Sequence, residues 1–354
     1  MFTTLSSLYR TSFAVLAVRT HCLSLPKFTS MLKAGLVGAG HLGKIHLRLL
    51  QQSPKYDLIG FYDADPENGL KLEKEFGYRY FSNLDELLGQ VQMLDIVTPT
   101  LFHYSYAKKA IENGLHFFIE KPVTQTLEQA EEILQLCREK NIKAQVGHVE
   151  RYNPAFTGAR NYIVDPMFIE IHRLAEFNPR GTDVSVVLDL MIHDLDILLS
   201  IVKSPVKNIY ASGVCVVSRS PDITNARIEF ENGCVANLTT SRISMKSMRK
   251  SRFFQKDAYI SVDFLEKKAE VIRMKPAPDV PNDFDMIIEN AEGERNQIIF
   301  EYPNIQTNNA ILDELESFAN AVTADRPVEV SLEDGTEALR VALEIVRLIS
   351  TGND

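Results

Sequence analysis

Residues 34–43 read AGLVGAGHLG and place three glycines in the spacing G-x-G-x-x-G, directly after a short apolar run. Gly38 permits a tight turn, Gly40 lets the backbone approach a pyrophosphate, and Gly43 allows a helix to pack closely on the preceding strand. The stretch therefore predicts a strand, a phosphate-binding turn and a helix, which is the start of a dinucleotide-binding α/β domain.

The residues around this turn support a dinucleotide site. The helix predicted for 41–52 has free N–H groups at its start that would face the phosphates, so His41 and Leu42 are expected beside the cofactor. Asp63 ends the next strand-like stretch, FYDAD, at the spacing typical of the acid that binds a ribose. A carboxylate there accepts bonds from ribose hydroxyls and repels a 2′-phosphate, which predicts NAD as the cofactor.

The pattern of strands and helices after this turn predicts two domains. Over 32–150, short apolar strands alternate with amphipathic helices, which predicts a parallel sheet covered by helices. Over 151–354 the chain becomes strand-rich, and ENG at 231–233 has the signature of a hairpin. We expect an α/β Rossmann domain followed by an α+β domain with a large, mainly antiparallel open sheet, and two C-terminal amphipathic helices that pack back on the first domain.

The composition of the chain limits the kinds of partner and environment that we expect for it. The net charge of −9 argues against general nucleic-acid binding. No apolar stretch approaches the ~20 residues that span a bilayer. The four cysteines form no CxxC pair, which favours reduced thiols in the cytoplasm over a disulfide framework or a metal site. An open sheet needs a cover for one face, so we expect a homodimer or homotetramer.

The first 31 residues have basic residues and no acidic one. They fit either a transit peptide or a leader translated upstream of a start at Met31. We favour the leader and leave 1–31 out of the fold.

Two strand ends carry further candidate residues. TPTLFH at 98–103 and IEKPV at 119–123 both follow predicted strands, and open parallel sheets bind ligands at the carboxyl ends of their strands. The residues expected around the cofactor there are Thr98, Pro99, His103, Glu120 and Lys121.

The stretch DLMIHDLDILL at 189–199 offers a proton acceptor. At ~100° per residue, Asp189, His193 and Asp196 lie on one side of a helix. These residues form either the solvent-exposed face of an amphipathic helix or a catalytic pair in which a carboxylate supports the imidazole. The crevice predicted upstream favours the second reading, with Asp196 structural.

Taken in order, these motifs (GxGxxG, the acid, TPxxxH, EKP and DxxxHD) resemble the glucose–fructose oxidoreductase/inositol dehydrogenase (Gfo/Idh/MocA) family over almost the whole chain beyond Met31. The resemblance implies that Lys121 contacts the reacting hydroxyl and the nicotinamide ribose, and that Asp189 and His193 form an acid–histidine pair. Oxidation of a secondary alcohol fits this set, because His193 can accept the proton, Asp189 can orient the imidazole, and Lys121 can stabilise an alkoxide.

The segment GHVERYNPAF at 147–156 resembles one found in UDP-N-acetylglucosamine 3-dehydrogenases of that family. Four of its residues are candidate substrate contacts: His148, Arg151, Tyr152 and Asn153. Arg151 fits either a diphosphate or a salt bridge between domains, and His148 fits either substrate contact or plain packing. Arg173, Arg180 and the basic stretch 244–252, expected as a flexible loop, are weaker anion-binding candidates.

Three functions remain open from the sequence. The first is a nucleotide-sugar 3-dehydrogenase, the second a dehydrogenase of a free sugar or inositol, and the third a non-catalytic NAD-binding regulator. The presence of the three expected catalytic residues argues against the third function: Lys121, Asp189 and His193.

Overall fold

The computed structural model describes residues 31–178 and 184–351. Residues 1–30, most of the segment 1–31 for which we expect a leader, and Arg180 lie outside the described residues. Within those ranges, no helix combines the length and apolar character needed to cross a membrane. Cys137, Cys215 and Cys234 are free thiols.

The first half of the chain forms a five-stranded sheet whose hydrogen-bonded pairs are all parallel, in the order β2-β1-β3-β4-β5. Its strands are β1 (Leu32–Val37), β2 (Tyr56–Tyr62), β3 (Met93–Ile96), β4 (His116–Glu120) and β5 (Ala144–Gly147). The helices between them are α1 (His41–Gln52), α2 (Pro66–Phe76), α3 (Leu84–Leu88), α4 (His103–Glu112) and α5 (Leu127–Lys140). The predicted Rossmann-type sheet is confirmed, and its strands are mostly apolar because helices cover both faces.

The second half contains a nine-stranded sheet in the order β13-β14-β12-β11-β10-β6-β9-β8-β7. Its strands are β6 (Phe168–Leu174), β7 (Val206–Val214), β8 (Ile223–Phe230), β9 (Val235–Ser241), β10 (Met248–Gln255), β11 (Ala258–Asp263), β12 (Lys268–Pro276), β13 (Met286–Glu289) and β14 (Arg295–Glu301). All neighbours are antiparallel except β6 and β9, which confirms the mainly antiparallel sheet. The hairpin at 231–233 is also confirmed, with Gly233 at φ 88° between β8 and β9.

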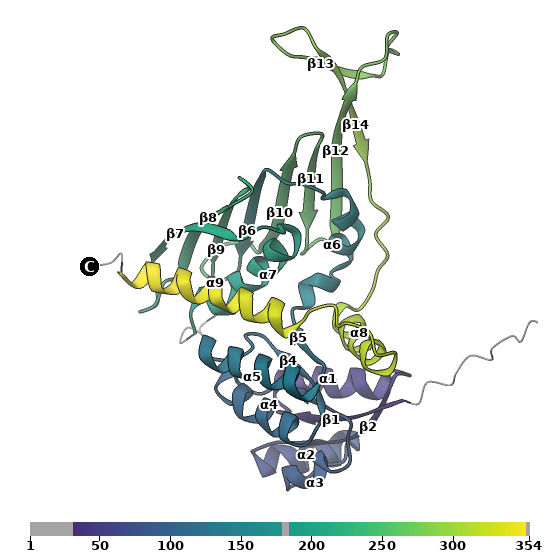
Figure 1. The fold of residues 1–354 in the computed structure, drawn as a ribbon, viewed down its shortest axis with the longest axis vertical. Helices are drawn as coiled ribbons and strands as arrows, with labels where there is room; N and C mark the ends of the chain where they lie inside the picture. Colours follow the sequence, from purple (N-terminus) through teal and green to yellow (C-terminus); the bar gives the residue numbers. More distant parts are fainter. Residues whose placement is uncertain (1–30, 179–183, 352–354) are drawn as a thin grey trace, which may run out of the picture. The chain divides into compact units, whose positions relative to one another are not determined.

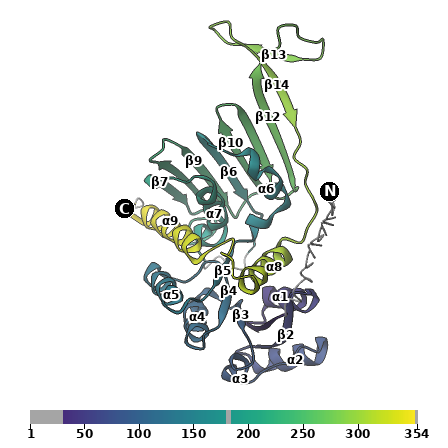
Figure 2. The ribbon, with the colours of Figure 1, turned by 45° about the vertical axis from the view of Figure 1, so that its right-hand side comes forward.

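One face of this sheet is covered by helices. Figures 1 and 2 place α6 (Pro154–Ala159), α7 (Ile192–Ile201) and α9 (Leu332–Thr351) over it. The strand residues on that face form the core with these helices, as Ile169, Ile228 and Phe253 illustrate with 0% exposure. Buried and more exposed residues therefore alternate along β6, β8 and β9.

The opposite face carries a row of apolar side chains. Strand register places Val235, Phe168, Phe254, Tyr259, Ile272 and Phe300 side by side across six strands. β12 and β14 continue beyond their neighbours as a ribbon that ends at β13 (Figure 1).

The last helices return to the first sheet. α8 (Ala310–Thr323) packs beside α1, and its Phe318 ring lies 6.3 Å from that of Phe118 in β4. α9 contacts α5, α7 and β7. One expectation is wrong: the stretch 244–252 is a loop only to residue 247, because residues from Met248 onward pair with β6 and β11 as part of β10.

Candidate functional site

The glycine turn is shaped for a phosphate. Gly38 has φ 92°, and a Cβ on Gly43 would lie 2.0 Å from the carbonyl oxygen of Gly38. A Cβ on Gly40 would meet nothing within 4 Å, so this side of the turn is open. No side chain caps the start of α1, which leaves its first N–H groups available to an anion. The turn therefore fits the pyrophosphate of NAD.

Asp63 faces this turn. Its carboxylate accepts hydrogen bonds from the backbone N–H of Ala39 at 2.8 Å and of Asp65 at 2.9 Å, which fixes its orientation. The side chain of Asn68 also donates to it at 3.0 Å. Asn68 was not predicted, although its place in the first turn of the helix after Asp63 is a usable signal.

A cleft of about 450 Å³ opens over these groups. Several expected cofactor residues line it, namely Gly38, Gly40, Asp63, Thr98 and Pro99. The rings of Phe102 and Tyr106 line it too, and sequence reasoning missed both. His41 is exposed and Leu42 half-buried in the first turn of α1.

His103 joins two loops of the site. It is 1% exposed, its Nδ1 lies 2.9 Å from the carbonyl oxygen of Pro122, and its Nε2 lies 2.8 Å from that of Thr98. Burial lowers its pKa. Both ring nitrogens thus face the backbone of the loops after β3 and β4 rather than the cleft, so His103 fixes the two strand ends relative to each other.

Lys121 extends from the end of β4 to the second half of the chain. Its Nζ donates to the backbone carbonyl of Asp189 at 2.7 Å and lies 3.5 Å from Asp189 Oδ1. Asp189 belongs to a π-helical turn, Val187–Met191, that precedes α7. A π turn changes the angular spacing of the residues before it, so Asp189 turns toward Lys121 rather than toward His193. The expected carboxylate support of the imidazole is corrected accordingly.

His193 meets a second histidine instead. Its ring is perpendicular to that of His148, with the centroids 6.3 Å apart. Nδ1 of His193 and both ring nitrogens of His148 are buried and make no hydrogen bond within the described ranges. Burial, followed by the charges of Lys121 and Arg173, holds the pKa of His193 well below its usual value. Burial also lowers the pKa of His148. The neutral forms of both rings are therefore favoured, and a neutral imidazole nitrogen without a partner is suited to accept a proton.

Arg151 is paired internally. It is 6% exposed, and its Nε and Nη2 donate to the two carboxylate oxygens of Asp196 at 2.6 and 2.7 Å. Of its two predicted roles, the salt bridge is the one that the geometry provides, with Asp196 as the acid. The side chain is buried and bound to Asp196 through two N–H groups, so the expected diphosphate contact is corrected to a structural pair.

The neighbours of Arg151 in the GHVERYNP segment are structural as well. Asn153 caps α6 by accepting from the N–H of Ala155 at 3.1 Å and donates to the carboxylate of Glu150 at 3.0 Å. The hydroxyl of Tyr152 accepts from Gln145 at 3.3 Å. Of the four expected substrate contacts, His148 is the one whose side-chain polar atoms have no partner among the described residues, and it lies beside His193.

An ion-pair network missed by the sequence reasoning lies next to the histidines. Arg173 is 3% exposed and binds Asp194 at 2.9 Å and Glu150 at 3.1 Å, so this weaker anion-binding candidate is neutralised. Arg249 is the more open cation, with a half-exposed side chain 3.5 Å from Glu150. No local pattern distinguishes these residues, because their partners lie on other elements.

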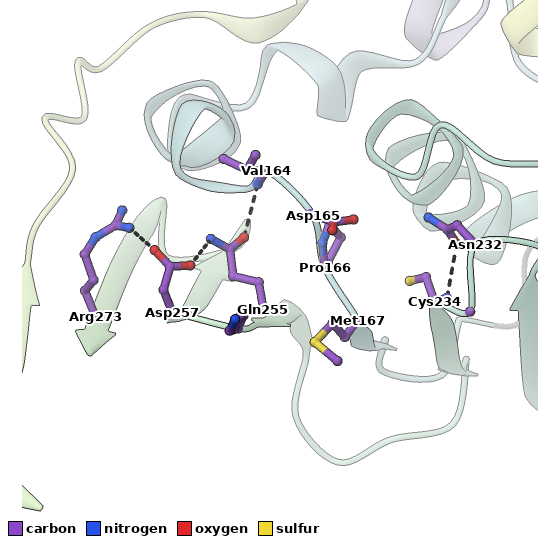
Figure 3. A pocket seen from close by; sticks show the side chains of 11 residues that line it. Val164, Asp165, Pro166, Met167, Asn232, Cys234, Gln255, Asp257 and Arg273 are labelled. Carbon is purple, nitrogen blue, oxygen red and sulfur yellow. Dashed lines mark hydrogen bonds and ion pairs between the residues drawn. The ribbon is translucent and has the colours of Figure 1, made fainter. Parts of the chain in front are cut away.

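A second cleft, of about 590 Å³, lies elsewhere on the large sheet (Figure 3). Three of its polar side chains form a chain of hydrogen bonds: Gln255 accepts from the backbone N–H of Val164 and donates to Asp257, and Arg273 donates to Asp257. It contains none of the residues expected to bind the cofactor or the substrate. The candidate cofactor-binding and catalytic residues therefore lie at the carboxyl ends of β1, β4 and β5 and at the start of α7.

Comparisons with known proteins agree with this geometry. The profile of the GFO_IDH_MocA oxidoreductase family, described as an NAD-binding Rossmann fold, matches residues 32–148, and the profile of a C-terminal domain of that family matches 164–255.

Individual relatives agree too. The chain is 33% identical over 315 residues to a UDP-N-acetylglucosamine 3-dehydrogenase of Acidithiobacillus ferrooxidans, covering 89% of this chain and 96% of that protein. A solved structure of the same enzyme superposes with a TM-score of 0.82 at 32% identity over 91% of this chain and 98% of that one. The scyllo-inositol 2-dehydrogenase of Bacillus subtilis is 26% identical over 60% of this chain and 68% of its own length.

Proposed function

Because this chain belongs to the Gfo/Idh/MocA oxidoreductase family, we propose that it oxidises the 3-hydroxyl of a nucleotide sugar, with UDP-N-acetylglucosamine as the leading substrate. The protein is an NAD-dependent dehydrogenase that acts on a sugar hydroxyl. The nucleotide sugar and the oxidised position are the proposed part.

NAD supplies the acceptor for the hydride that leaves the sugar carbon. In this chain, the open side of Gly40 and the uncapped start of α1 fit its pyrophosphate, and Asp63 fits a ribose. Asp63 repels a 2′-phosphate, which favours NAD over NADP.

His193 acts in our proposal as the base that takes the proton of the sugar hydroxyl. Its lowered pKa keeps the ring neutral, and Nδ1 has no competing partner in the part of the chain that the structure describes. Lys121 provides the positive charge that stabilises the developing alkoxide. Asp189 orients Lys121 through the 2.7 Å bond from Nζ to its carbonyl oxygen.

The single observation that carries the substrate proposal is the likeness to the UDP-N-acetylglucosamine 3-dehydrogenase over nearly the full length of both chains. Arg249 supports it, because a half-exposed guanidinium beside the buried Glu150–Arg173 pair is available to a diphosphate. A free sugar or inositol is the second candidate, since a scyllo-inositol dehydrogenase is also related.

The deciding experiment is a panel assay that follows NADH formation with UDP-N-acetylglucosamine, glucose and inositol. Turnover of the nucleotide sugar alone supports the proposal. Turnover of free polyols alone transfers the assignment to the second candidate.

The apolar row on the open sheet face points to a second copy of the chain as its cover. Phe254 is 36% exposed and Phe300 48% exposed, although both lie in regular strands. A homodimer through this face would bury the row, and a tetramer would need a further surface.

A further inference from the structure

A buried histidine connects the cofactor helix to the loop of Lys121. His46 lies in α1, three residues after Gly43, and is 0% exposed. Its Nδ1 is 2.9 Å from Oδ2 of Asp95 in β3, which is also 0% exposed. On the other side of the ring, Nε2 is 3.4 Å from Oε1 of Glu120 in β4. One imidazole thus stands between two carboxylates.

Glu120 directly precedes Lys121 and contacts its backbone. Its side chain is 14% exposed, and its Oε2 accepts from the backbone N–H of Lys121 at 3.3 Å. A Cβ on Gly147 would come within 2.8 Å of Oε1, so the glycine at the end of β5 leaves the space that this carboxylate occupies. Glu120 therefore turns toward α1 and contacts both His46 and the loop of Lys121.

The charges around His46 favour its protonated form. Burial would lower its pKa, but the negative charges of Asp95 and Glu120 and the bond to Asp95 outweigh burial and raise it. Burial raises the pKa of Glu120, while His46 and Lys121 act against that rise. Glu314 of α8 is buried nearby, with a pKa far above its usual value because of burial and of these carboxylates. A proton on His46 favours the ionised form of Glu120 in this acidic interior.

The contact between His46 and Glu120 is longer than a well-aligned hydrogen bond. Nε2 of His46 and Oδ1 of Asp95 are buried and lack hydrogen-bond partners among residues 31–178 and 184–351. The 3.4 Å separation from Glu120 is therefore an ion-pair contact without hydrogen-bond alignment. A small shift of the ring or of Glu120 would form that bond.

We propose that His46 is a positioning residue for the reaction, acting through the carboxylate of Glu120 on the backbone and charge of Lys121. The inference rests on the proposed role of Lys121. Under this proposal α1 has two roles. Its N-terminus fits the cofactor phosphates, and its His46 helps to position Lys121 at the end of β4 through Glu120. The groups that face the ring are Asp95 and Phe118 directly and Glu120 at ion-pair distance. Burial raises the pKa values of Glu314 and Tyr56, and both lie close enough to these acids for the negative charges to raise them further.

The first test needs no substrate. The chain has eight histidines, so selective labelling of histidine yields a short list of ring signals to follow by NMR against pH. The signal lost in His46→Gln identifies His46. We expect this signal to titrate above pH 6.5 in the wild type and at a lower pH in Glu120→Gln, because the variant removes one of the two negative charges.

The second test measures coupling in turnover. His46→Gln and Glu120→Gln should each lower kcat by about tenfold or more, since small misplacements of a reacting group are costly. The affinity for NADH, followed by its fluorescence, should change little. The double variant should be no worse than either single variant, because both act through one contact. His116→Gln, at the start of the same strand, is the matched control and should leave kcat unchanged.

Two results overturn the inference: a His46 titration that is the same in Glu120→Gln, or single-variant losses of kcat that multiply in the double variant. If His46→Gln fails to fold, Glu120→Gln decides alone, since wild-type kcat and unshifted histidine signals in that variant refute the proposal. If the wild type turns over no sugar, the proposed function fails, whereas the titration still decides whether Glu120 and His46 are coupled.

Discussion

The ammonium of Lys121 donates a 2.7 Å hydrogen bond to the backbone carbonyl of Asp189. This bond joins the carboxyl end of β4, beside the cofactor turn, to the π turn that leads into α7. A lysine side chain normally has many accessible rotamers, and the bond restricts Lys121 to one of them. The two halves of the chain therefore meet where the proposed chemistry takes place.

Replacement of Lys121 by methionine keeps the length of the side chain and removes its charge. We expect kcat to fall by ~10²-fold or more, because electrostatic stabilisation of an alkoxide is lost. The dissociation constant for NADH, measured by fluorescence, should stay within about threefold if the phosphate and ribose contacts dominate binding. Near-normal turnover of Lys121→Met would remove the lysine from the mechanism.

Replacement of His193 by alanine should lower kcat by ~10²-fold or more while NAD still binds, because the general base is lost. In the wild type, protonation stops the base from working, so activity falls as pH decreases through the pKa of His193. That pKa lies well below 6.5, which places this loss below pH 6.5. A wild-type pH profile that persists in His193→Ala would show that another group is the base.

Asp63 should determine the choice of cofactor. A hydrogen bond to a charged group contributes ~1.5–3 kcal/mol, so Asp63→Ser should weaken NAD binding by roughly tenfold or more. The same change removes a charge that repels the 2′-phosphate, and the ratio of kcat/KM for NADP to that for NAD should rise. A wild-type enzyme that prefers NADP would contradict the assignment.

Arg151 should matter for stability rather than for substrate binding. Arg151→Met leaves the buried Asp196 without its partner, and we expect the free energy of unfolding to fall by ~3–5 kcal/mol. The double variant Arg151→Met/Asp196→Leu should recover much of this loss, because both charges are then absent. Urea unfolding measures the effect. A stable Arg151→Met variant with a strongly raised KM for the sugar would restore Arg151 as a substrate contact.

The open sheet face should hold two copies together. Phe254 pairs in register with Phe168 and Tyr259 at the centre of the apolar row, and its ring contacts both. Phe254→Glu places a charge there and should shift the mass found by light scattering toward the monomer. Met167→Glu, at an exposed site just before β6, is a surface control. An unchanged assembly in Phe254→Glu would exclude this face as the interface.

Local rules in the sequence were sufficient for the architecture. The glycine spacing at 38–43, the alternation of strands with helices and the hairpin at 231–233 all depend on backbone geometry within a few residues. The positions of Asp63 and Lys121 at strand ends follow from the same rules, because parallel strands present their carboxyl ends at one edge. These features could be predicted, and the structure contains them.

The pairing of charged side chains was decided only by the tertiary structure. A helical wheel placed Asp189 beside His193, but the π turn directs it to Lys121, 68 residues away in sequence. The same segment supplies Asp196 to Arg151 and Asp194 to Arg173, and neither pair has a sequence signature. The energy of a buried charge depends on what the folded chain brings within a few ångströms, and local spacing does not contain that information.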